Sequence, residues 1–81
     1  MRIVRDADRP LDAWRSGVDT RMIVSAQSGA RQLTIFEQHC ASGHGAPAHL
    51  HAVEEVLRIL AGRADVWVEK EHATLESGCS V

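Results

Sequence analysis

The sequence has no long hydrophobic run and no cluster of basic residues. No apolar stretch approaches the roughly 20 residues that a membrane-spanning helix needs, so we expect no membrane segment. The nine lysine and arginine residues are scattered along the chain, and the net charge is −2. A nucleic-acid-binding protein needs a basic stripe to neutralise phosphates, and this sequence has none. These absences argue against membrane and nucleic-acid partners.

Paired cysteines and a secretory leader are also lacking. Cys40 and Cys79 stand alone without CxxC spacing, and the first ten residues, MRIVRDADRP, contain no apolar region of a signal peptide. We therefore expect reduced thiols and a cytoplasmic location. No Ser-His-Asp order, phosphate-binding glycine loop or Walker sequence is present.

The chain is short, at 81 residues, and we expect a single domain over residues 1–81. Hydrophobic residues make up 44% and charged residues 25%, which is typical of a globular domain. A domain of this size buries only about 60% of its unfolded surface, so its core is marginal. A metal, a partner subunit or further chain would add stability.

The distribution of turn residues predicts an all-β fold. We expect short strands over 2–4, 21–29, 30–40, 63–70 and 71–78. The intervening residues 5–20 and 41–48 read as loops, the first with Trp14 as its apolar anchor. Many short strands separated by frequent turns indicate a β-sandwich or barrel.

Residues 50–61, LHAVEEVLRILA, fit two structures. Their apolar residues recur at helical spacing, and Gly62 would then follow the end of a helix. The periodicity slightly favours a helix but does not decide between helix and strand.

His49 and His51 are two positions apart, and this spacing places them differently on a strand and on a helix. On a strand, His49 and His51 face the same side, whereas on a helix they point about 200° apart. Glu55 joins them if the chain bends near Ala52 and Val53. Two histidines and a carboxylate form the facial arrangement of non-haem iron and related metals, and zinc with a bound water also fits. An isolated His-x-His is more often a pair of half-exposed side chains, so spacing alone does not establish a site.

The longer pattern resembles the first conserved motif of the cupin superfamily. Gly43, His49, His51, Glu55 and Gly62 match it position for position across 20 residues. The resemblance implies a small cupin with an antiparallel jelly-roll β-barrel. It also implies one divalent metal (Fe, Mn, Ni, Cu or Zn) held by His49, His51 and Glu55. Residues 50–61 are then a strand, and Gly62 is the turn that follows it.

The second cupin motif is cut off. Gly78 resembles its first position, and the sequence stops at Val81, before the histidine that supplies a fourth ligand in the family. We therefore expect a domain truncated at its C-terminus, with a barrel that is incomplete or completed by a partner chain. The resemblance implies pairing of two chains, and together with the marginal size and the missing strands it leads us to expect a homodimer.

The resemblance implies three functions. The first is a metal-dependent enzyme of oxygenase, isomerase or lyase type that acts on a small organic substrate. The second is a non-enzymatic barrel that binds or senses a small molecule, and the third is a structural or dimerisation module. No catalytic residue is assigned, because fold does not fix function.

The other histidine, cysteine, acidic and aromatic residues are interpreted as structural or surface residues. A zinc site built from His39, Cys40 and His44 lacks the paired short spacing of structural zinc ligands. We expect Glu54 and His72 at the surface. We expect Phe36 in the core and Cys79 as a small buried hydrophobic residue. Trp14 and Trp67 are expected in packing or at a subunit interface.

Overall fold

The computed structural model describes all residues, Met1–Val81, and divides them into two compact units, Met1–Ala48 and His49–Val81. Its regular elements are five β-strands and two short 3-10 turns, and it has no α-helix. The chain is therefore all-β, as the sequence predicts. No helix has the length and hydrophobicity needed to traverse a bilayer.

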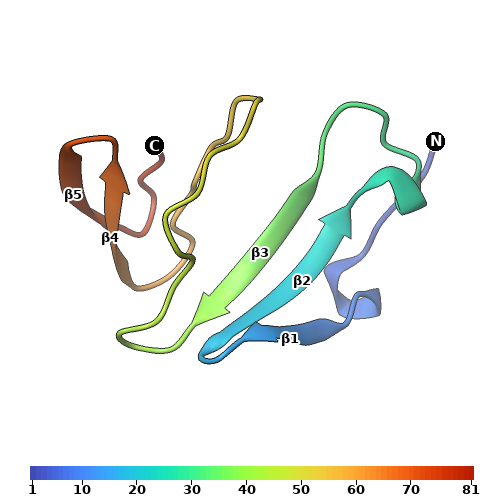
Figure 1. Ribbon diagram of the computed structural model, residues 1–81. Helices are drawn as coiled ribbons and strands as arrows, with labels where there is room; N and C mark the ends of the chain where they lie inside the picture. Colours follow the sequence, from blue (N-terminus) through green and yellow to red (C-terminus); the bar gives the residue numbers. More distant parts are fainter. The chain divides into compact units, whose positions relative to one another are not determined.

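The first unit is built around a three-stranded antiparallel sheet. Its strands are β1 (Leu11–Arg15), β2 (Val18–Val24) and β3 (Ile35–Cys40), which pair in the order β1-β2-β3 (Figure 1). The turn η1 (Asp6–Asp8) precedes β1, and η2 (Ala26–Ser28) lies in the connection from β2 to β3. Each strand pairs with its neighbour in sequence, so the sheet is a simple meander.

Two N-terminal predictions are wrong. Residues 2–4 belong to no strand, because no other segment pairs with them, and the expected loop over 5–20 contains all of β1 and the start of β2. The register places Ala13 opposite Asp19 and Arg15 opposite Val18, which leaves Trp14 as the extra residue of a β-bulge. This bulge interrupts the alternation by which a strand is recognised in a sequence.

The expected strands 21–29 and 30–40 are shorter than predicted. β2 ends at Val24 and β3 begins at Ile35. Between them Ser25 and Ser28 close a tight turn, in which the Ser25 backbone N–H donates to Ser28 Oγ at 2.9 Å and Ser28 N–H donates to the Ser25 carbonyl at 3.0 Å. Local hydrogen bonds, from both backbone and side chain, thus replace strand pairing here.

The second unit contains one β-hairpin, formed by β4 (Arg63–Val68) and β5 (Glu71–Glu76) (Figure 1). Strands were predicted over 63–70 and 71–78, and both are present with shorter bounds. In β4, Ala64 and Val66 are half-buried, whereas Trp67 is 67% and Val68 52% exposed. Gly62, with φ +76°, lies directly before β4, and this left-handed conformation suits a glycine.

The chain buries very little by itself. Val18 in β2 is its one fully buried hydrophobic side chain. Phe36, expected in the core, is 45% exposed, so that expectation is wrong within a single chain. Two small sheets with this much exposed apolar surface are consistent with an incomplete jelly roll.

Candidate metal site

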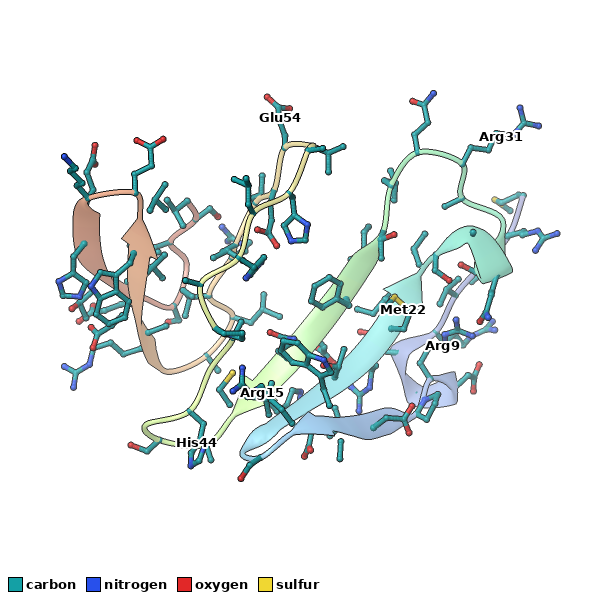
Figure 2. The ribbon with its side chains drawn as sticks, viewed as in Figure 1. Arg9, Arg15, Met22, Arg31, His44 and Glu54 are labelled. Atoms are coloured by element: carbon teal, nitrogen blue, oxygen red, sulfur yellow. The ribbon has the colours of Figure 1, made fainter.

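Residues 49–56 form the loop that carries the predicted ligands. The backbone bends at Ala52 and Val53, the position at which a bend was required to bring Glu55 to the two histidines. The chain then runs back toward the β4–β5 hairpin (Figure 1). Glu54 projects outward at the tip of the loop, in agreement with its expected surface position (Figure 2). The bend lets residues on its two sides approach each other.

The prediction of a continuous strand over residues 50–61 is wrong. These residues form neither a strand nor the alternative helix, apart from an isolated bridge between Arg58 and Ser80. Leu57 N–H donates to the Val81 carbonyl at 2.8 Å, and Val81 N–H donates back at 2.9 Å. Residues before this pairing lack a neighbouring strand, so they stay in a loop.

The bridge fixes the chain just after Glu55. Ile59 N–H donates to the Cys79 carbonyl at 3.0 Å, and Arg58 Nη1 donates to Ser80 Oγ at 3.0 Å. Glu55 therefore lies two residues before a hydrogen-bonded anchor within the same unit.

His49, His51 and Glu55 come together in this loop. One ligand atom of each lies within 4.8 Å of the other two. His49 Nε2 is 3.8 Å from Glu55 Oε2, and His51 Nε2 is 3.7 Å from Glu55 Oε1, so each imidazole faces a different carboxylate oxygen. The two imidazole rings meet edge to face, with centroids 4.6 Å apart.

This donor set fits a divalent metal. Ligand atoms at about 2.0–2.2 Å from one ion lie roughly 3.0–3.5 Å from each other. The carboxylate–imidazole separations of 3.7 and 3.8 Å exceed that range by a few tenths of an ångström, and the three ligand atoms lie within 4.8 Å of one another, so the side chains have to draw together to share one ion. Imidazole nitrogens with one carboxylate suit iron, manganese, nickel, copper or zinc.

The site is open to solvent. The side chains of His49, His51 and Glu55 are 44%, 49% and 38% exposed. Three protein ligands leave further coordination positions for water or a small molecule, as in catalytic metal sites. The arrangement is thus accessible to an external ligand.

The other titratable candidates do not assemble into a second such site. His39 Nε2 lies 3.7 Å from Glu37 Oε1, and His72 Nε2 lies 3.8 Å from Asp65 Oδ1. His44 packs over Gly17. Apart from the loop site, the structure brings no three histidine, cysteine or acidic residues together with metal-binding spacing.

Trp67 stacks on His72 across the β4–β5 hairpin, with ring centroids 4.5 Å apart and planes inclined by 14°. On the same strands Thr74 Oγ1 donates to Asp65 Oδ1 at 2.6 Å. These cross-strand contacts support the packing role expected for Trp67.

Comparison with known proteins identifies one family. A family model described as "Cupin domain" matches residues 36–81, which include the candidate metal site and both strands of the second unit. No curated protein and no solved structure matches the chain significantly.

Proposed function

The chain belongs to the cupin domain family, and we propose that it binds one divalent metal ion through His49, His51 and Glu55. The observation that carries the proposal is the convergence of these three side chains, whose ligand atoms lie within 4.8 Å of one another. We further propose that the bound ion serves a metal-dependent reaction on a small organic substrate.

Each ligand residue has a distinct part in this proposal. His49 and His51 offer neutral imidazole nitrogens, and Glu55 supplies the negative charge that offsets part of the ion's charge. A bound divalent ion acts as a Lewis acid or oxygen-activating centre. Because all three side chains are partly exposed, a substrate can reach the site from solvent.

The alternative is a barrel that binds or senses a small molecule without turnover. The same open geometry supports it, since three protein ligands leave room for a small molecule beside the metal. We also propose that two chains pair as a homodimer, because one chain buries a single hydrophobic side chain completely.

Elemental analysis of the purified chain tests metal binding. We expect about one equivalent of Fe, Mn, Ni, Cu or Zn per chain, lost in the His49→Ala/His51→Ala double variant. The His72→Ala variant is the matched control, because His72 lies in the same unit outside the site. Equal metal content in all three proteins, including after reconstitution, would contradict the proposal.

A second experiment separates the enzyme from the binding module. The metal-loaded chain is incubated with a panel of small organic acids and sugars, and product formation and thermal stabilisation are measured in parallel. Metal-dependent turnover supports the enzyme, whereas stabilisation by a compound that is recovered unchanged supports the binding module.

A further inference from the structure

Two adjoining grooves lie on the first unit, away from the metal-site loop in sequence. Their volumes are about 410 and 650 Å³, and both are lined by Arg2, Val4 and Ser28. They are formed where the N-terminal segment passes η2 and the loop that follows it (Figure 1). Both grooves are shallow and open to solvent, so a molecule bound there would keep part of its surface exposed.

The walls of these grooves are strongly basic. Arg2, Arg5 and Arg9 line the first groove together with one acid, Asp8, and Arg31 joins Arg2 in the second. None of the four arginines forms an ion pair, whereas Arg21 in β2 is paired with Glu37 at 2.6 Å. Positive charge therefore exceeds negative charge in the groove walls, although the chain carries a net charge of −2.

Local contacts hold two of the arginines in place. Arg9 is half-buried, and its Nε donates to the Met22 carbonyl at 3.0 Å. The Arg2 side chain lies over Gly29, where an added Cβ would be 3.1 Å from Arg2 Nε and 3.2 Å from Arg2 Cζ. The absence of a side chain at Gly29 thus makes room for the Arg2 guanidinium.

The other two are free to reach a ligand. Arg5 and Arg31 are exposed, and Arg31 projects into solvent from the loop after η2 (Figure 2). Apolar side chains complete the walls, with Ile3 in the first groove and Val24 and Leu33 in the second. The grooves thus offer guanidinium donors beside apolar surface.

We propose that these grooves form a binding site for a small phosphate-bearing organic molecule. Guanidinium groups bind phosphate oxygens in bidentate fashion, and several arginines suit a group with two or more negative charges. The apolar walls contact the organic part of the ligand. This inference concerns residues of the first unit and does not depend on the metal site.

Titration of the metal-free chain (residues 1–81) with inorganic pyrophosphate, followed by amide NMR, tests the site. We expect saturable shifts at the groove residues. The Arg2→Gln/Arg31→Gln double variant is expected to weaken affinity at least tenfold, and Arg31→Gln alone about threefold. Arg15→Gln is the matched control, because Arg15 ends β1 in the same unit and lines neither groove.

Three results would overturn the proposal. These are shifts that do not saturate, shifts located outside the groove residues, and an equal loss of affinity in Arg15→Gln. Citrate is the carboxylate comparison, and citrate that binds as tightly as pyrophosphate would overturn the assignment to phosphate. The amide spectra report whether each variant is folded, and Arg31→Gln provides the test if the double variant is not.

Discussion

Gly17 is the residue at which two structural demands coincide. It forms the turn between β1 and β2 with φ +76°, and its carbonyl accepts a hydrogen bond from Ala41 N–H at 2.8 Å. The His44 side chain covers it so closely that an added Cβ would lie 2.7 Å from His44 Cβ. Glycine therefore satisfies both the backbone conformation and the packing.

We predict that Gly17→Ala lowers the free energy of unfolding by about 1–2 kcal/mol, from the positive φ and the displaced imidazole. Urea unfolding followed by tryptophan fluorescence measures this change. Gly45→Ala is the control, because Gly45 has no positive φ and no atom within 4 Å of an added Cβ. Equal effects of the two substitutions would contradict the explanation.

At the residue scale the sequence predicted the three candidate ligands through a resemblance, not through periodicity. The spacing of His49 and His51 was compatible with a common site only if the chain was extended. The bend at Ala52 and Val53 was inferred from the need to bring Glu55 close, and the structure has it. The arginines of the grooves were not found, because they are far apart in sequence and only folding gathers them.

At the scale of elements, the β4–β5 hairpin contains a strained position. Glu69 begins its two-residue turn with φ 54°, and it is the one non-glycine residue with positive φ. Two-residue hairpins favour glycine or asparagine at such positions, because a Cβ is disfavoured there.

We predict that Glu69→Gly raises the free energy of unfolding of the hairpin unit by about 0.5–1 kcal/mol, since it removes this strain. Thermal unfolding measures the change. Lys70→Gly is the matched control, and it is expected to be neutral or destabilising because Lys70 already has negative φ. If Lys70→Gly stabilised the hairpin as much as Glu69→Gly, the backbone of Glu69 would not be the source of strain.

The bridge that follows the metal-site loop gives a second prediction at this scale. The amides of Leu57, Ile59 and Val81 donate backbone hydrogen bonds, whereas those of residues 52–56 donate none. We therefore expect slower hydrogen exchange at the three bonded amides than at residues 52–56. Equal exchange rates in the two groups would show that the bridge does not anchor the loop.

Strands with regular alternation were predicted well, and the others were not. β4 and β5 pair with each other in regular register through a short local turn, so their pairing depends on residues that are close in sequence. β1 was missed because it carries exposed polar residues and a bulge, so its existence depends on pairing with β2. Residues 50–56 were expected in a strand, but no segment of this chain pairs with them.

At the scale of the whole molecule, many large apolar side chains are exposed. Large hydrophobic side chains with more than about a third of their surface exposed occur in both units, among them Trp14, Ile35, Leu60 and Trp67. Surface of this kind is typical of a protein that buries it against another chain. The short length and the marginal core predicted from the sequence agree with the small amount of buried apolar surface.

We therefore predict that the chain self-associates. Sedimentation at several concentrations is expected to give a dimer, and the melting temperature is expected to rise with protein concentration. A concentration-independent monomer would contradict the proposed homodimer.

The most direct test of the proposed function is the affinity of the metal-free chain for Zn²⁺, measured by calorimetry for the unaltered chain, Glu55→Gln and Glu54→Gln. The two substitutions remove the same charge from neighbouring residues, but only Glu55 faces the histidines. We predict one site per chain, weakened at least tenfold in Glu55→Gln and within about twofold of its original affinity in Glu54→Gln. Equal weakening in both variants, or in neither, would contradict a metal site formed by His49, His51 and Glu55.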